Sequence, residues 1–279
     1  MNPRALVDGR AAAAVSLDDR GLRYGDGLFE SIRIDAGRPV WWEEHRQRLA
    51  RGCAVLGLDM PPPALLADEL AQLCSSENGV LRLLLTRADA ARGYAPAAAA
   101  TTRRILVFSD APPVAATPLV LGLATLRLGI QPQLAGLKHL NRLEQVLAAR
   151  ECAELGVDEC LLLDADGAVT CGIAGNLFIV SNGRLRTPLL DRCGIAGTCR
   201  EWILRTHSGV REERLDSTAV DAADELFLCN SVRGILPVGQ LGARRLPVGA
   251  LTLALMQRLA EEQPALRHPL LAAVGRAAG

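Results

Sequence analysis

The chain has 279 residues, of which 49% are apolar, and its 31 basic residues balance its 31 acidic residues. This length predicts one large or two medium domains with a substantial core. A formal net charge of zero without a run of like charges provides no electrostatic footprint for nucleic acid or an anionic membrane surface. We therefore expect small molecules as partners, with no nucleic acid and no membrane.

The N-terminal stretch, residues 1–21, has only a short alanine run flanked by charges, which lacks the apolar core of a signal peptide. No apolar span reaches the length of about 18 residues that a membrane helix needs. Eight cysteines are scattered without a CxxC pair, and four histidines are dispersed. This pattern favours reduced thiols over a disulfide framework or a metal site. Together these features predict a cytoplasmic protein without a metal centre.

The first third of the sequence reads as strand, strand, helix, helix, strand, strand. Apolar and β-branched runs predict strands over 27–34, 38–42, 79–88 and 103–109. Apolar residues at helical spacing predict helices over 43–57 and 64–74.

The clearest break in the chain lies at residues 110–118, which contain three prolines. Proline disfavours both a helix interior and a central strand. We therefore predict a smaller N-terminal domain over 1–110, a linker over 111–118 and a larger C-terminal domain over 119–279.

Beyond this break, apolar runs and turn sequences predict more strands and two hairpins. The turns DADG and SNGR place hairpins over 159–170 and 176–188, and further strands are expected over 119–129 and 225–232. Helices are expected near 199–208 and 249–263. One more helix follows residue 138, with an apolar stripe formed by Leu140, Leu143, Val146 and Leu147. The fold class is therefore α+β.

Lys138 is the single lysine of the chain, so the other thirty basic residues are arginines. Either residue can serve as an ordinary surface charge. A desolvated lysine, however, can lose its proton and become a nucleophilic amine, whereas a guanidinium stays charged. Lys138 is therefore the first candidate for a covalent catalytic centre, against the alternative that one lysine survived by chance.

The sequence RCGIAGTCREWILR has the features of a phosphate site. Gly194 and Gly197 precede a helical run, so the amides of Thr198 and Cys199 are expected to point out of a helix N-terminus. Such an end attracts phosphate through its N–H groups and its dipole. The alternative is simple turn chemistry, which is the commoner role of a glycine-containing loop.

Other polar residues are weaker candidates. Arg48 lies on a predicted helix and either faces solvent or forms a fork to phosphate. Asn230 and Ser231 end a strand and either cap a loop or contact an anion. Arg92 and Tyr94 lie in an irregular segment and either anchor a loop or bind substrate. A lysine nucleophile combined with several phosphate sites matches what pyridoxal phosphate requires.

These motifs resemble the fold type IV pyridoxal-phosphate enzymes, which include the D-amino acid and branched-chain aminotransferases. RYGDGLFESIRI is similar to the N-terminal signature of this family, HRQRL to its arginine helix, GNLFIV to its asparagine strand and GIAGTCR to its phosphate loop. AGLKHLNRLEQV looks more like the lyases of the family than its aminotransferases. The resemblance spans nearly the whole chain and implies a two-domain fold whose larger C-terminal domain binds pyridoxal phosphate.

The resemblance also implies roles for individual residues. Lys138 is similar to the lysine that bonds the cofactor and then moves a proton, and Arg48 to an arginine that binds the cofactor phosphate. Thr198 and Cys199 belong to the loop whose amides hold this phosphate. Ser231 is similar to a residue whose hydroxyl contacts the phosphate in relatives.

One position departs from the family pattern. Five residues before Asn176, where the family usually has a glutamate that pairs with the pyridine nitrogen, this chain has Cys171. A thiol with an ordinary pKa of about 8.5 is a poor permanent counter-ion. The resemblance therefore implies a weaker electron sink, unless Asp164 or Asp166 reaches the ring from the DADG turn. This change disfavours transamination more than a lyase reaction that creates an aromatic ring.

The implied activity is a lyase that converts 4-amino-4-deoxychorismate into 4-aminobenzoate and pyruvate for folate biosynthesis, in a homodimer. One alternative is an aminotransferase of the same fold that acts on branched-chain or D-amino acids. Another is a non-catalytic descendant that binds a phosphate metabolite.

Overall fold

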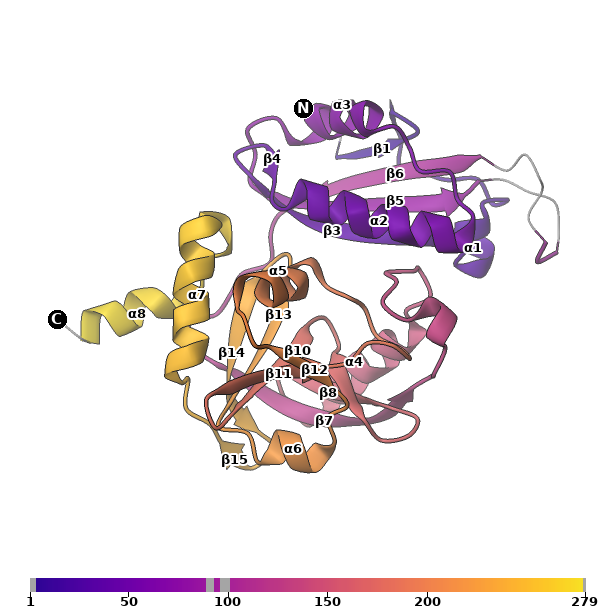
Figure 1. Cartoon of the computed structure of the whole chain (residues 1–279). Helices are drawn as coiled ribbons and strands as arrows, with labels where there is room; N and C mark the ends of the chain where they lie inside the picture. The colour runs from indigo at the N-terminus through magenta and orange to yellow at the C-terminus, as the bar shows by residue number, and fades with distance from the viewer. Residues whose placement is uncertain (1–3, 89–92, 96–100, 278–279) are drawn as a thin grey trace. The chain divides into compact units, whose positions relative to one another are not determined.

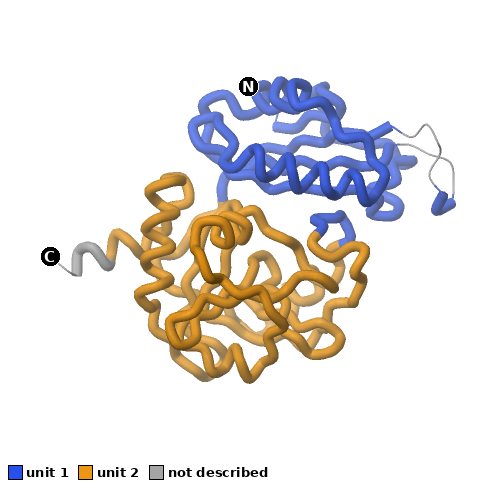
Figure 2. Tube along the Cα trace, viewed as in Figure 1, with its two compact units in different colours: residues 1–111, 137–141 blue, residues 112–136, 142–279 orange. Residues whose placement is uncertain are grey.

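In a computed structural model of the chain, residues 4–88, 93–95 and 101–277 are described. The chain divides into two compact units, which Figure 2 shows in different colours. Unit 1 consists of residues 1–111 and 137–141, and unit 2 of residues 112–136 and 142–279. The segment 137–141 thus packs with unit 1, although the chain on both sides of it belongs to unit 2.

Unit 1 is built on a six-stranded antiparallel sheet with the order β2-β1-β6-β5-β3-β4. The strands are β1 (Ala5–Val7), β2 (Arg10–Ala11), β3 (Gly27–Asp35), β4 (Arg38–Pro39), β5 (Gly79–Arg87) and β6 (Thr102–Ser109). The helices are α1 (Arg20–Tyr24), α2 (Trp42–Leu56) and α3 (Pro63–Cys74). Leu49 of α2 and Leu66 of α3 share one buried core with Ile32 and Leu83 of the sheet. Figure 1 shows α2 lying along β3 and β5.

Unit 2 contains a nine-stranded sheet with the path β12-β11-β10-β13-β14-β7-β8-β9, and β15 pairs with β14. The strands are β7 (Leu119–Leu128), β8 (Glu159–Asp164), β9 (Val169–Gly172), β10 (Asn176–Ser181), β11 (Arg184–Pro188), β12 (Arg211–Glu213), β13 (Glu225–Asn230), β14 (Gly234–Leu241) and β15 (Arg244–Arg245). β7 runs parallel to β8 and β14, and β11 runs parallel to β12. The other pairs are antiparallel.

The helices of unit 2 are α4 (Leu143–Leu155), α5 (Thr198–Thr206), α6 (Ser217–Asp221), α7 (Ala250–Glu262) and α8 (Leu270–Ala277), with 3₁₀ turns η1 (Pro132–Leu134) and η2 (Pro264–Leu266). Figure 1 shows α4, α5, α6 and α7 beside the sheet of unit 2, whereas α8 extends away from it beyond α7. Within the described ranges, no helix combines the length and apolar character needed to cross a membrane.

The longer predicted strands and helices are confirmed, but the strand predicted over 38–42 is wrong beyond Pro39. The β3–β4 register ends at Pro39, although the amide of Val40 still donates to the carbonyl of Arg33 at 2.8 Å. Trp41 then adopts a left-handed φ of 53° as the N-cap of α2, which begins at Trp42. The sequence did not predict β14 or the short elements β1, β2, α1, β12, α6, β15 and α8.

The predicted apolar stripe after Lys138 is only partly helical. α4 begins at Leu143, so Leu140 precedes it. Leu143, Val146 and Leu147 are 77%, 57% and 48% exposed. The buried side chains of the helix are small, because α4 packs on the sheet through residues such as Ala148. The helix therefore exposes three apolar side chains beside charged ones such as Arg150, and exposed apolar patches are typical of contact surfaces.

Candidate active site

Lys138 is held against strand β3 of unit 1 by backbone pairing. The amide of Phe29 donates to the carbonyl of Lys138 at 2.9 Å, and the amide of Leu140 donates to the carbonyl of Gly27 at 3.0 Å. The Lys138 Nζ atom lies 4.2 Å from the centre of the Phe29 ring. The segment 137–141 therefore acts as an added edge to β3 and places the single lysine beside an aromatic ring.

A buried ion-pair network occupies the next residue of the same strand. Nε of Arg48 donates to Oε1 of Glu30 at 2.8 Å, and Nη2 of Arg48 contacts Oε2 of Glu30. Nδ1 of His45 lies 2.7 Å from the same Oε2. His45 and Arg48 share one face of α2 because they are three residues apart. Arg48 is only 5% exposed, so the solvated-face alternative for it is wrong.

The charges of this network depend on one another. Burial would raise the pKa of Glu30, but Arg48 and His45 together outweigh burial and lower that pKa to about 2. Burial lowers the pKa of His45 below its ordinary value, which outweighs the attraction of Glu30. Among the described residues, Nε2 of His45 is buried without a hydrogen-bond partner. We interpret the network as Glu30 carboxylate, Arg48 guanidinium and neutral His45, with Nδ1–H donating to Glu30.

This network predicts acid-sensitive folding of unit 1. An unfolded Glu30 binds its proton near pH 4.5, whereas the folded one binds it near pH 2. The stabilisation by Glu30 is therefore complete above pH 4.5 and is lost as the pH falls towards 2, and it amounts to about 3 kcal/mol. The pKa of His45 is lowered in the folded protein, so folding stability also falls as the pH drops below 6.5, the ordinary pKa of histidine. Urea unfolding followed by tryptophan fluorescence between pH 7 and 3 measures this loss.

Glu30→Gln is the matched variant for the acid measurement, because a neutral amide can accept a hydrogen bond from Arg48 but does not titrate. Its free energy of unfolding should fall less steeply with acid between pH 5 and 3 than that of the wild type. Equal slopes for the two proteins would contradict the assignment of the low pKa to Glu30.

The phosphate loop predicted over 194–200 lies at the N-terminus of α5 in unit 2. Gly136 pairs with this loop, because its amide donates to the carbonyl of Gly194 at 3.0 Å and its carbonyl accepts from the amide of Ala196 at 3.1 Å. Gly136 is the residue two positions before Lys138 in the chain. Nδ2 of Asn176 also donates to the carbonyl of Ile195 at 2.8 Å. The loop is thus fixed from two sides.

The end of α5 has the features that bind a phosphate group. Gly197 is the N-cap, and it provides no side-chain oxygen for the first amides of the helix. Thr198 is 2% exposed, and within the described residues its Oγ1 atom is buried without a hydrogen-bond partner. Orphaned donors at a helix N-terminus form an anion-binding site. The thiol of Cys199 faces Cys229 in the core, so only the amide of Cys199 is a candidate phosphate ligand.

Gly197→Ala is expected to disrupt this loop. A Cβ atom at Gly197 would lie 2.1 Å from Oδ1 of Asn176, so Asn176 must move and its bond to Ile195 is lost. We expect pyridoxal phosphate to bind about ten- to a hundredfold more weakly, since displaced amides forfeit charge-assisted hydrogen bonds. Gly129→Ala is the control, because the new Cβ would meet only the end of the Glu144 side chain at 3.3 Å. Fluorescence titration with the cofactor compares the variants, and equal affinities would contradict the role of the loop.

Asn230 caps the loop that contains Ser231. Oδ1 of Asn230 accepts from the amides of Val232 at 3.0 Å and Arg233 at 2.8 Å, and its Nδ2 donates to the carbonyl of Ala174 at 3.2 Å. The loop-capping alternative for Asn230 is therefore confirmed. Its role is to fix the turn on which Ser231 lies.

Cys171 lies on β9 and is 8% exposed. Burial, reinforced by Cys193 and Glu159, raises the pKa of its thiol to about 12. The thiol is therefore neutral at physiological pH and cannot serve as an anionic partner. The carboxylate of Glu159 has local partners instead. It accepts a hydrogen bond from the amide of Ala174 at 3.0 Å and lies 3.7 Å from Arg233.

The two acids of the DADG turn are also engaged locally. Oδ1 of Asp164 accepts from the amides of Asp166 at 3.0 Å and Ala168 at 2.9 Å. Asp166 pairs with Arg192. The Asp164 contacts stabilise the turn itself, and the Asp166 contact ties the turn to the loop that contains Arg192.

Of the two substrate-binding candidates, Arg92 lies outside the described residues. Tyr94 is 86% exposed, and its ring centre lies 5.5 Å from that of Tyr24. Its carbonyl accepts a hydrogen bond from Arg20 at 2.7 Å. These contacts are those of a loop anchor, and substrate binding by Tyr94 stays a prediction.

Four residues that shape these sites had no role predicted from the sequence: Phe29, Glu30, His45 and Asn176, the last of which was named only as part of the GNLFIV motif. One available signal was Glu30 itself, an acid inside the apolar run GLFESIRI that shares a strand face with Leu28 and Ile32. A buried acid requires a partner, and the neighbouring helix offers His45 and Arg48 at helical spacing. No comparable signal pointed to the contact between Asn176 and Ile195, because the two residues meet only in the folded chain.

Comparison with known proteins gives a family and a fold. The family model for Amino-transferase class IV matches residues 27–241. The aminodeoxychorismate lyase of Vibrio harveyi is 32% identical over 266 residues, which cover 91% of this chain and 98% of that protein. The crystal structure of 4-amino-4-deoxychorismate lyase from Pseudomonas aeruginosa has a TM-score of 0.85 and 43% identity, and the alignment covers 93% of this chain and 99% of that one.

A third similar structure contains a derivative of the cofactor. It is a branched-chain amino acid aminotransferase in complex with N-(5'-phosphopyridoxyl)-L-glutamate. Its TM-score is 0.80 at 23% identity, with 96% of each chain covered. At this identity the likeness concerns the fold alone.

Proposed function

Because this chain belongs to the Amino-transferase class IV family, we propose that it is a pyridoxal-phosphate-dependent lyase that converts 4-amino-4-deoxychorismate into 4-aminobenzoate and pyruvate. The observation that carries this proposal is the 43% identity with a solved lyase over 93% of the chain, against 23% with a solved branched-chain aminotransferase. In this reaction the carbon–oxygen bond to the enolpyruvyl group breaks, one ring proton is lost, and the ring becomes aromatic.

The residues of each unit fit the cofactor. Bound pyridoxal phosphate supplies an electron sink next to the amine-bearing carbon of the substrate. Lys138 would hold the cofactor through its Nζ amine, and that amine would remove the proton from that carbon. The N-terminus of α5 and Oγ1 of Thr198 would hold the phosphate, with Arg48 and Ser231 as the further partners that the family resemblance implies. The orphaned Thr198 hydroxyl supports this assignment.

Cys171 is the residue assigned to the pyridine nitrogen. A neutral buried thiol would not stabilise a protonated ring nitrogen as a glutamate would, so a bound cofactor would be a weaker electron sink here. A lyase tolerates this because aromatisation of the substrate ring drives the reaction, whereas an aminotransferase has no such compensation.

Cys171→Glu is expected to raise half-transamination of simple amino acids more than it raises pyruvate release from aminodeoxychorismate. The carboxylate strengthens the electron sink, and only the lyase reaction already has another driving force. Cys171→Ala is the control and should keep the lyase rate within a few fold. Both activities are measured on the same preparations, and a large loss of lyase activity in Cys171→Ala would show that the thiol participates.

The proposed function is tested with purified protein, added pyridoxal phosphate and aminodeoxychorismate. Pyruvate and 4-aminobenzoate should appear in equal amounts without any keto acid acceptor. Turnover of branched-chain or D-amino acids that requires an acceptor would instead support the aminotransferase alternative. A protein that binds the cofactor but turns over neither substrate class would support the non-catalytic alternative.

A homodimer and a cytoplasmic location complete the proposal. The exposed apolar side chains of α4, Leu143, Val146 and Leu147, support a dimer because a second copy would cover them. All eight cysteines are free thiols, which supports a reducing compartment. Sedimentation equilibrium of the wild type and of Leu147→Glu tests the dimer, and an unchanged mass would exclude this face from the interface.

A further inference from the structure

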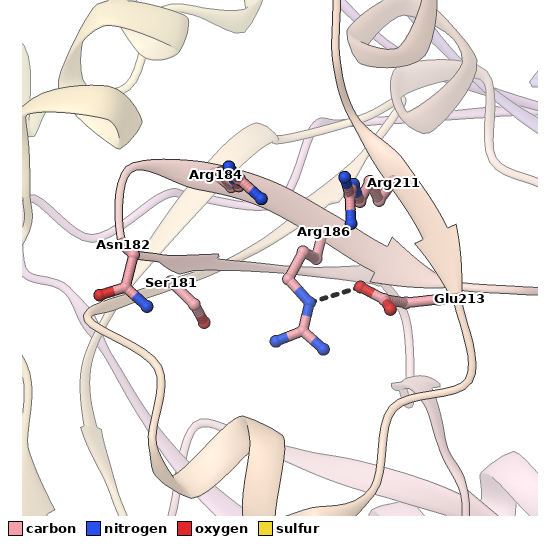
Figure 3. Close-up of a pocket in the computed structure, with 6 residues that line it drawn as sticks. All are labelled: Ser181, Asn182, Arg184, Arg186, Arg211 and Glu213. Carbon is pink, nitrogen blue, oxygen red and sulfur yellow. Dashed lines mark hydrogen bonds and ion pairs between the residues drawn. The ribbon is translucent and has the colours of Figure 1, made fainter.

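A polar cavity at the edge of the unit 2 sheet is not used by the proposed reaction. Its volume is about 460 Å³. Figure 3 shows the side chains that line it, from the ends of β10 and β11 and from β12: Ser181, Asn182, Arg184, Arg186, Arg211 and Glu213. Cavities that bind small ligands have volumes of roughly 300 to 1,000 Å³.

Strand register brings three arginines to one face of this edge. Arg184 and Arg186 are two residues apart on β11, so their side chains point to the same side. Arg186 pairs directly with Arg211 of the parallel strand β12. Like charges at directly paired positions destabilise a sheet, and an anion bound between them would offset this repulsion.

Only one of these arginines has an acidic partner in the cavity. Nε of Arg186 lies 2.5 Å from Oε1 of Glu213, as the dashed line in Figure 3 shows. Within the described part of the chain, Arg184 and Arg211 make no ion pair. The cavity therefore has two uncompensated positive charges.

A hydroxyl group at the same place also lacks a partner. Oγ of Ser181 is buried, and no described residue accepts or donates a hydrogen bond to it. A buried hydroxyl without a partner is costly, which indicates that a ligand or solvent satisfies it. The side-chain amide of Asn182 adds donors at the rim.

This cavity is separate from the phosphate loop at α5. Strand β10 links the two, since Asn176 at its start holds the loop and Ser181 at its end lines the cavity. Five residues of extended strand span about 17 Å. A ligand in the cavity therefore does not occupy the cofactor phosphate site.

From these observations we infer that the cavity binds a small anion with at least two negative charges, held by Arg184, Arg186 and Arg211. Guanidinium forks bind phosphate and carboxylate oxygens by paired, charge-assisted hydrogen bonds. The lining residues include no aromatic or aliphatic side chain, so the ligand is a compact polyanion without a large apolar part. Phosphoryl and polycarboxylate ligands share this chemistry.

Isothermal titration of the cofactor-loaded protein tests the site, because bound cofactor keeps the probe out of the α5 loop. The probes are pyrophosphate, citrate and, as the singly charged control, acetate. We expect saturable binding of pyrophosphate or citrate, and no binding of acetate. Arg184→Gln and Arg211→Gln should each weaken the binding about tenfold, equivalent to about 1.4 kcal/mol, and the double variant should abolish it.

Arg245→Gln is the matched control, since Arg245 is an exposed arginine of the same unit outside the cavity. It should bind the probes like the wild type. A preference for pyrophosphate identifies a phosphoryl ligand, and a preference for citrate identifies a polycarboxylate. The inference is overturned if the double variant binds as the wild type does, or if neither pyrophosphate nor citrate binds. If the protein does not retain pyridoxal phosphate, the same variants still distinguish anion binding in the cavity from binding at the α5 loop, because they leave that loop intact.

Discussion

Lys138→Arg is expected to abolish both turnover and the visible absorbance of lysine-bound cofactor while the fold is retained. The guanidinium keeps a positive charge beside the Phe29 ring but cannot provide a neutral amine. Pyruvate release should fall by about 10²- to 10⁴-fold or more, which is the contribution of a positioned acid–base group. Circular dichroism, absorbance with added pyridoxal phosphate and pyruvate release measure the three properties.

The absence of other lysines makes a labelling experiment unusually specific. Borohydride reduction of the cofactor-loaded wild type should attach the cofactor to the peptide that contains Lys138, and Lys138→Ala should take up no label there. Label found only at the N-terminal amine, or wild-type absorbance in Lys138→Arg, would contradict the assignment.

Arg48→Met is expected to destabilise unit 1 by about 3 to 5 kcal/mol, because it leaves the carboxylate of Glu30 buried and without its cationic partner. Methionine keeps most of the side-chain volume, so the effect reflects the lost ion pair more than a cavity. Urea unfolding at pH 7, followed by the fluorescence of Trp41 and Trp42, measures the change. Arg51→Met on the exposed side of α2 is the control and should change stability by about 0.5 kcal/mol or less.

The same variant separates two roles of Arg48. If Arg48 also binds the cofactor phosphate, the affinity of the folded Arg48→Met protein for pyridoxal phosphate should fall. Adding Glu30→Gln should restore part of the stability, since no buried carboxylate then remains, but it should not restore cofactor affinity. A single variant as stable as the wild type would contradict the buried network.

The ion pair with Glu30 affects how an Arg48→Ala variant is interpreted. The sequence alone suggests that a loss of cofactor affinity in this variant measures phosphate binding by Arg48. In the structure, Arg48 is bidentate to a fully buried acid, so a loss of cofactor affinity has two possible causes. Stability and affinity must therefore be measured on the same variant.

Two features of the candidate site could be read from the sequence, and the catalytic role of Lys138 stays a prediction. Lys138 is the only lysine, and an amine has a property that guanidinium lacks, so composition alone pointed to this residue. The glycines of GIAGTCR predicted a helix N-terminus free for an anion, and α5 begins at Thr198 as that pattern required. Turn sequences and strand periodicity predicted the two hairpins because both are properties of short segments.

Other features were decided only by the tertiary structure. Glu30 and Arg48 are 18 residues apart, and their pairing depends on α2 lying along the face of β3 that bears Glu30. The segment 137–141 joins unit 1 because its backbone pairs with Gly27 and Phe29, more than a hundred residues earlier in the chain. An apolar stripe on a helix usually faces the core. In α4 the small side chains pack on the sheet instead, and the leucines of the predicted stripe are exposed. Local patterns determine which elements form, whereas the partner of a buried charge or an apolar face depends on contacts between segments that are distant in the sequence.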